Sequence, residues 1–155
     1  MRHGLLKVFY LVGFLTLGYC FPLLAEDAGQ AKVVGIKGDV KFLKAGAYDW
    51  AVLQQGMILS EGDAIKTGED GEAKLELIGT KKTADVTVRK SSEFQIKTLR
   101  QDKGSSTDST LLDIEVGSVL VKAEKLIGES RFEVKTPTSI VGIRGTTFEV
   151  NVSKS

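Results

Sequence analysis

The sequence Glu-Ala-Lys-Leu-Glu-Leu at residues 72–77 carries the pattern that decides the fold class. Ala73, Leu75 and Leu77 alternate with charged side chains, which is the period of a strand with one buried and one solvent-facing side. A helix would instead place its apolar residues three and four positions apart. The stretch therefore predicts a half-buried β-strand.

Similar short alternating runs recur on both sides of this stretch and are separated by turns rich in glycine. They lie at residues 32–37, 40–43, 51–53, 57–59, 64–67, 85–88, 94–96, 112–116, 119–121, 132–134 and 148–152. Many short strands at about ten-residue spacing are typical of all-β architectures. We predict a β-sandwich or roll of about ten short antiparallel strands, with a roll like a double-stranded β-helix as a variant. The polar residues 100–110 are predicted to form an exposed, mobile hairpin loop.

The first 25 residues have the layout of an export signal. Arg2 and Lys7 precede an uncharged apolar run, and Ala25 stands just before two acidic residues. This order predicts a signal peptide over residues 1–25, with cleavage after Ala25. An uncleaved membrane anchor and lipidation at Cys20 are the alternatives. Each of them places one domain, residues 26–155, in the periplasm or outside the cell, with membrane targeting confined to the N-terminus.

The composition of residues 26–155 excludes several kinds of chemistry. The only histidine and the only cysteine of the chain are His3 and Cys20, both within the export signal. The domain therefore cannot form a Ser-His-Asp triad, a cysteine nucleophile, or a zinc site with histidine or cysteine ligands. The formal net charge of the chain is only +1, which argues against nucleic acid as a partner. We expect no enzyme activity and no cofactor.

The end of the chain carries the most specific motif. Residues 132–150 read Phe-Glu-Val-Lys-Thr-Pro-Thr-Ser-Ile-Val-Gly-Ile-Arg-Gly-Thr-Thr-Phe-Glu-Val. Together with residues 38–43, Trp50 and the segment Leu-Ser-Glu-Gly-Asp-Ala-Ile-Lys-Thr-Gly at residues 59–68, this motif resembles the FecR domain family. Regulators in that family combine a cytoplasmic anti-sigma segment, a membrane helix and a periplasmic region. Because only a short segment precedes the apolar run, we expect a stand-alone exported FecR-domain protein without the anti-sigma segment.

Most residues of these motifs have a structural interpretation. Pro137 restricts Thr136 to extended geometry, and Gly142 and Gly145 permit backbone conformations that let residues 140–143 turn inward. Asp63 is expected to accept hydrogen bonds from backbone N–H groups two residues further on. The positions that we assign to the fold are Gly62, Asp63, Thr136, Pro137, Gly145, Thr146 and Phe148.

Two residues are the candidate contacts with a ligand or partner. Arg144 is expected to clamp loop carbonyls or to pair with Asp63 or Asp39, and a ligand contact is the alternative. Trp50, the only tryptophan, either plugs the end of the core or stacks on a sugar ring.

The acidic residues between positions 61 and 72 raise one further alternative, a calcium site. They are Glu61, Asp63, Glu69, Asp70 and Glu72. Oxygen ligands of this kind bind Ca²⁺, but the spacing of a calcium-binding loop is missing. We therefore predict no metal.

These features together predict a non-catalytic binding or scaffold module of the bacterial cell envelope. Its partner would be another envelope protein or a cell-wall polymer, contacted through a sheet edge or a loop. Residues 146–152 form the last expected strand, which would offer unpaired backbone groups if it lies at an edge. The alternatives are a periplasmic sensor component of an iron-type sigma/anti-sigma system and a carbohydrate-binding module.

Overall fold

The computed structural model describes residues 27–153, so the signal peptide prediction lies outside the described residues. This part of the chain is all-β, as the alternating pattern predicts, and none of it forms a helix long and apolar enough to cross a membrane. The thirteen strands are β1 (Asp27–Ala28), β2 (Gln30–Lys37), β3 (Val40–Leu43), β4 (Ala51–Val52), β5 (Ile58–Leu59), β6 (Ala64–Thr67), β7 (Glu72–Ile78), β8 (Lys82–Val88), β9 (Glu93–Asp102), β10 (Thr107–Ala123), β11 (Arg131–Lys135), β12 (Ile140–Ile143) and β13 (Thr147–Val152).

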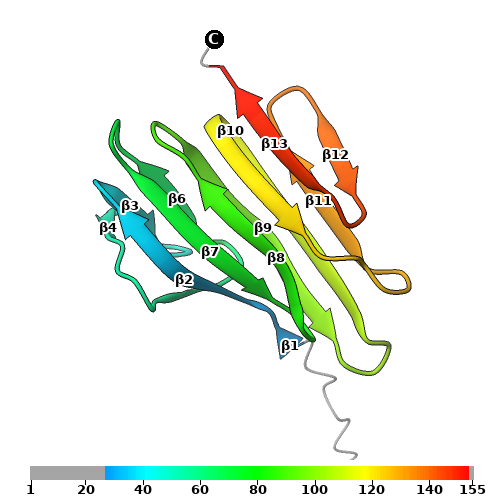
Figure 1. Cartoon of the computed structure of the whole chain (residues 1–155). Coiled ribbons are helices and arrows are strands. Elements are labelled where there is room, and N and C mark those ends of the chain that lie inside the picture. Colours follow the sequence, from blue (N-terminus) through cyan, green and yellow to red (C-terminus); the bar gives the residue numbers. More distant parts are fainter. Residues whose placement is uncertain (1–26, 154–155) are drawn as a thin grey trace, which may run out of the picture.

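The strands form two sheets that share β10 and curl into a half-barrel (Figure 1). One sheet runs β4-β3-β6-β9-β10-β11-β12, with β1 paired to β9. The other runs β5-β2-β7-β8-β10-β13. The first part of β10 pairs with β9 and β11, and its second part pairs with β8 and β13. This curled arrangement confirms the predicted sandwich or roll.

Gly117 lies where β10 passes from one sheet to the other. Its φ of +98° belongs to the region that residues with a Cβ rarely adopt. A Cβ at this position would also collide with the side chain of Ser92. The Ser92 hydroxyl accepts a hydrogen bond from the Ser118 backbone N–H at 3.0 Å. Glycine is therefore required here, because the backbone of β10 turns over the β8–β9 connection.

The core fills the space between the two sheets with the inward side chains of the alternating runs. Ala73, Leu75 and Leu77 are all at most 1% exposed, which confirms the half-buried strand predicted for residues 72–77. The largest fully buried side chains come from both sheets: Phe94, Phe132, Leu59, Ile65, Leu75, Leu77, Ile96, Leu99, Leu112, Ile114, Val33 and Val40. The inner faces of the two sheets therefore contribute to one hydrophobic core.

Several details differ from the sequence prediction. The strands number thirteen rather than about ten, and β10 pairs with β11 in parallel instead of antiparallel. The predicted loop at residues 100–110 is wrong in extent, because β9 continues to Asp102 and β10 begins at Thr107. Asp108 and Thr110 within it are buried. The stretch lacks apolar residues, yet its backbone is paired with neighbouring strands and its polar side chains form hydrogen bonds.

Candidate functional site

Asp63 lies at the centre of a buried hydrogen-bond network. Its side chain is fully buried and accepts hydrogen bonds from the backbone N–H groups of Ala45 and Ser60 at 2.8 and 2.9 Å. The Lys44 ammonium lies 2.9 Å from the same carboxylate. The donors precede Asp63 in the chain rather than follow it, which differs from the expected turn. The network holds the loop after β3 against the loop between β5 and β6, and both carboxylate oxygens of Asp63 are engaged within the fold.

Gly62 makes this network possible. Its φ is +90°, and a Cβ built on it would lie 2.8 Å from the Cβ of Ala45. Since Ala45 donates its backbone N–H to Asp63, a side chain at Gly62 would push apart the two segments that Asp63 joins. The Gly-Asp pair of the motif thus belongs to the fold.

The calcium alternative finds no geometric support among the described residues. Asp63 is engaged by Lys44 and two backbone donors, and Glu61 is paired with Arg100 through contacts of 3.1 Å. Within residues 27–153, no group of three or more acidic side chains converges in a way that could hold a metal ion.

Two carboxyl groups, that of Glu61 in the loop after β5 and that of Asp102 at the end of β9, have pKa values below their ordinary range. A hydrogen bond from Arg100 is the main cause for Glu61, and hydrogen bonds from Ser105 and the Gly104 backbone are the causes for Asp102. The first pair ties the loop after β5 to β9. The second shapes the β9–β10 turn. Both carboxylates therefore have structural partners.

Trp50 lies at the rim of the first sheet, just before β4, and is half-buried rather than enclosed by the core. The Lys66 ammonium stands 5.8 Å from the centroid of its ring and 3.3 Å from the Glu93 carboxylate. Tyr48 nearby in sequence is 96% exposed. Trp50 is thus held at the edge of the core with one ring face covered by a cation, and it forms no enclosed sugar pocket.

The turn between β11 and β12 contains Thr136 and Pro137. The Thr136 backbone N–H donates to the Ser139 carbonyl at 2.8 Å, and the Ser139 N–H donates to the Thr136 hydroxyl at 3.1 Å. Pro137 occupies an exposed turn position whose missing N–H costs nothing. These bonds close the hairpin and fix the register of β12.

Gly145 and Gly142 differ in the way they are needed. Gly145 has a φ of +67°, and a Cβ on it would lie 3.0 Å from the Lys125 Cα. Gly142 has no such φ and has open space around it, so the prediction that it needs glycine geometry is wrong. Thr146 follows Gly145, and its carbonyl accepts from the Ala123 N–H at 3.1 Å.

Arg144 lies in the exposed turn between β12 and β13. The expected pairing with Asp63 or Asp39 is wrong, because the Asp63 carboxylate is paired with Lys44 and the Asp39 carboxylate with Lys41. Among the described residues, Arg144 has no ion pair. It is therefore available for a contact outside this domain.

The strand β12 forms one free edge of the first sheet. It pairs with β11, and with no other strand of the described part of the chain. Ile140 is 64% exposed and Val141 is 43% exposed, so the prediction that both turn inward is wrong. Ile143 alone of these apolar side chains is buried. The edge offers four consecutive residues without charge.

The direction of the backbone groups of β12 follows from the hairpin. Because Thr136 bonds to Ser139, the alternation of an antiparallel ladder points the peptide groups of Val141 and Ile143 toward β11. The N–H and C=O groups of Ile140 and Gly142 therefore point away from the sheet. They are the hydrogen-bonding positions of the open edge.

The strand β13 forms the corresponding free edge of the second sheet and pairs only with β10 within residues 27–153. Its Phe148, Val150 and Val152 pack against the core. Glu149 lies back across the sheet, 2.7 Å from the Ser118 hydroxyl and 3.1 Å from the Arg89 Nε. The two C-terminal strands, β12 and β13 (Figure 1), thus form free edges of different sheets, and these edges differ in their side chains.

The fold and its open edges define an all-β domain whose C-terminal motif, residues 132–150, forms the edge strands. Within the described residues it has no metal centre. The family model described as FecR protein matches residues 63–155, so the chain belongs to the FecR family. The FecR domain is known from sigma/anti-sigma signalling systems, whose FecR proteins are associated with the cell envelope. The searches of curated proteins and of solved structures returned no match.

The free edge formed by β12 was not predicted from the sequence. The sequence shows an uncharged run at residues 140–143, but such a run is equally typical of a buried strand. Only the pairing of β11 with β10 on one side and with β12 on the other shows that no further strand of the described chain pairs with β12.

Proposed function

We propose that the domain is a non-catalytic binding module of the cell envelope that takes up an extended segment of another envelope protein along β12. The observation that carries the proposal is an uncharged, solvent-exposed edge strand with unpaired backbone groups at Ile140 and Gly142. Strand addition at such an edge is a recurrent mode of peptide recognition.

The chemistry of the edge favours a peptide over other occupants. The outward N–H and C=O groups of Ile140 and Gly142 match the spacing of an added strand, which would contribute about 1 kcal/mol per hydrogen bond. The exposed side chains of Ile140 and Val141 provide apolar contacts beside these bonds. Isolated sheet edges usually carry a charge or a bulge that discourages pairing, and β12 has neither.

The absence of catalysis in this proposal rests on the side chains that the domain contains. Residues 26–155 have neither histidine nor cysteine. The buried carboxylates Asp63, Asp108 and Asp113 are all engaged, by Lys44, by Thr80, and by Lys97 and Lys135 respectively. A buried carboxylate held by such donors is typical of a structural network rather than a general base.

The experiment compares two proline substitutions in the full tagged chain. Gly142→Pro removes an outward N–H of β12 without touching the ladder to β11, and open space surrounds Gly142. Asn151→Pro removes an outward N–H of β13 in the same way. We expect Gly142→Pro to reduce recovery of the envelope partner at least tenfold, while Asn151→Pro leaves it unchanged. Equal recovery with both variants would refute the proposal.

Family membership favours a second candidate, a sensor component of a sigma/anti-sigma system. In that case the partner at β12 would be a membrane regulator. Deletion of the gene should then change the transcription of a neighbouring iron-uptake receptor gene, and the Gly142→Pro chain should fail to restore it. Normal transcription in the deletion strain would remove this candidate and leave the binding proposal standing.

A further inference from the structure

The strand β12 carries no charge of its own, but two cations lie at the turn that follows it. Arg144 comes directly after the last residue of β12 and is exposed. Lys125 packs against the same turn, because a Cβ at Gly145 would lie 3.0 Å from the Lys125 Cα. Neither Arg144 nor Lys125 forms an ion pair within residues 27–153. The C-terminal end of the open edge therefore carries positive charge.

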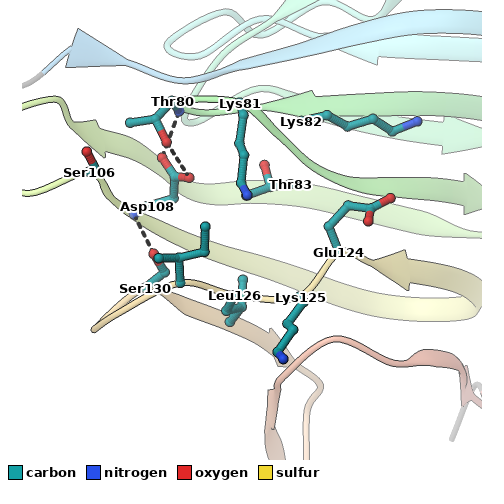
Figure 2. A pocket seen from close by; sticks show the side chains of 11 residues that line it. Thr80, Lys81, Lys82, Thr83, Ser106, Asp108, Glu124, Lys125, Leu126 and Ser130 are labelled. Carbon is teal, nitrogen blue, oxygen red and sulfur yellow. Dashed lines mark hydrogen bonds between the residues drawn. The ribbon is translucent and has the colours of Figure 1, made fainter.

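Glu124 precedes Lys125 in the chain but does not neutralise it. Figure 2 looks into the hollow between the β7–β8 turn and the segment after β10, and it shows the two side chains on opposite sides of this segment. Lys125 points away from Lys81, whereas Glu124 extends on the side of Lys82. A hydrogen bond to Asp85 is the main reason that the pKa of Lys82 lies above its ordinary value, and the charge of Glu124 adds to it. Glu124 therefore belongs to the charges around Lys82.

The charges around the whole of β12 also leave an excess of positive charge. At the other end of the strand, the Asp113 carboxylate lies 3.3 Å from the Lys135 ammonium and 3.8 Å from the Lys97 ammonium. The loop before β11, β11 itself, the part of β10 paired with it, Lys97 and the turn after β12 together contain five cations and three carboxylates. They are Lys97, Lys125, Arg131, Lys135 and Arg144, and Asp113, Glu129 and Glu133. A partner with negative charge matches these surroundings.

Glu133 limits where such a negative charge can lie. It is the cross-strand partner of Gly142 and stands on the outer face of β11, since the residues on either side of it, Phe132 and Val134, are buried. A strand added to β12 would place one residue beside Gly142 and another, two positions along on the same face, beside Arg144. A carboxylate in the first position would face Glu133 across a glycine, whereas one in the second position would meet Arg144. The edge therefore distinguishes between two positions of the bound segment.

We propose that the protein segment taken up by β12 is acidic, with an Asp or Glu side chain beside Arg144 and Lys125 and an uncharged run beside residues 140–142. This inference rests on the proposed strand addition at β12 and names the chemistry of the partner. The guanidinium of Arg144 can hold a carboxylate with two hydrogen bonds, and Lys125 adds attraction at longer range. Backbone hydrogen bonds alone specify register weakly, so the ion pair at the end of the strand also fixes the register of the segment.

The probe is a phage library of random twelve-residue peptides, selected against the immobilised full chain. We expect the enriched peptides to combine a short uncharged run with Asp or Glu at one end of it. Gly142→Pro should reduce their recovery at least tenfold, because it removes an outward N–H of β12. Arg144→Glu should also reduce their recovery at least tenfold, whereas Glu133→Gln should increase it several-fold.

Lys90→Glu is the matched control for the charge reversal. Lys90 lies two residues beyond Val88, which pairs with Val119, so it is roughly 20 Å from Ala123 at the rise of a strand. Its substitution should leave the recovery of the acidic peptides unchanged. A melting temperature close to that of the wild type shows that Arg144→Glu is folded, and Arg144→Gln should give a smaller loss in the same direction.

The outcomes separate this inference from the proposed function. Enriched peptides that depend on β12 but are neutral or basic would overturn the acidic partner and leave strand addition standing. Equal losses with Arg144→Glu and Lys90→Glu would do the same. Recovery that Gly142→Pro does not reduce would overturn strand addition at β12, and the acidic partner with it.

Discussion

The strands β12 and β13 are consecutive edge strands that lie on different sheets. β12 carries no charge and exposes Ile140 and Val141, whereas β13 turns its apolar side chains inward and ties Glu149 to Arg89 and Ser118. An edge carrying a charge resists pairing with another strand, and an edge without one invites it. The comparison teaches that free backbone groups alone do not make a docking edge; the side chains beside them decide.

The largest expected effect comes from proline in a strand that is not at an edge. Leu75 in β7 pairs with Val33 of β2 on one side and with Val86 of β8 on the other. Leu75→Pro therefore removes a ladder bond whichever way its N–H points, and it replaces a buried leucine. We expect complete loss of the folded state in circular dichroism and thermal melting. A melting curve like that of the wild type would contradict the topology on which both edges depend.

A pair of neighbouring proline substitutions tests which backbone groups of β13 are free. The Ala123 N–H donates to the Thr146 carbonyl, so the ladder points Val150 toward β10 and Asn151 toward solvent. Val150→Pro should lower the free energy of unfolding by about 3 kcal/mol, and Asn151→Pro by less than about 1 kcal/mol. Chemical denaturation measures both. Equal losses would show that β13 has no open side.

The turn that joins the two edges provides a smaller effect. Gly145→Ala places a side chain at positive φ and close to Lys125, and should cost about 1–2 kcal/mol. Gly142→Ala is the matched control, because open space surrounds Gly142, and it should change the free energy of unfolding by less than about 0.5 kcal/mol. A larger cost at Gly142 would mean that β12 is already covered in the free domain.

The smallest effect on stability should come from Glu149. Its pairing with Arg89 and Ser118 is partly exposed, so Glu149→Ala should cost less than about 1 kcal/mol. The substitution also removes the charge that distinguishes β13 from β12. We therefore expect Glu149→Ala to increase self-association in sedimentation velocity, and Gly142→Ala to leave it unchanged. Sedimentation that Glu149→Ala leaves unchanged would contradict the explanation based on edge charge.

The fold class could be predicted from the sequence because the alternation of apolar and polar residues is a local pattern, and this pattern shows which face of a strand is buried. The run around Leu75 shows its buried face directly, and glycines such as Gly62 mark turns that need positive φ. The parallel pairing of β10 with β11 and the passage of β10 between sheets could not be predicted, since they depend on residues far apart in the chain. Gly117 signalled a break, but the strand continues through it.

The candidate sites were less predictable than the fold. Arg144 was identified from its motif, but its expected carboxylate partner Asp63 is held by Lys44 instead. Trp50 was expected either to plug the end of the core or to stack on a sugar ring. It is half-buried, and Lys66 lies over its ring. The two cations at the end of the β12 edge, Lys125 and Arg144, lie far apart in the sequence and come to the same turn only through the fold.

The most direct test of the account is a photo-cross-link from each edge in the living cell. A benzophenone side chain replaces Ile140 on β12 in one version of the full chain and Asn151 on β13 in the other. The account predicts an adduct from position 140 with one extended peptide of an envelope protein, lost when Gly142→Pro is added, and no adduct from position 151. An adduct from position 151 alone, or none from either position, would contradict it.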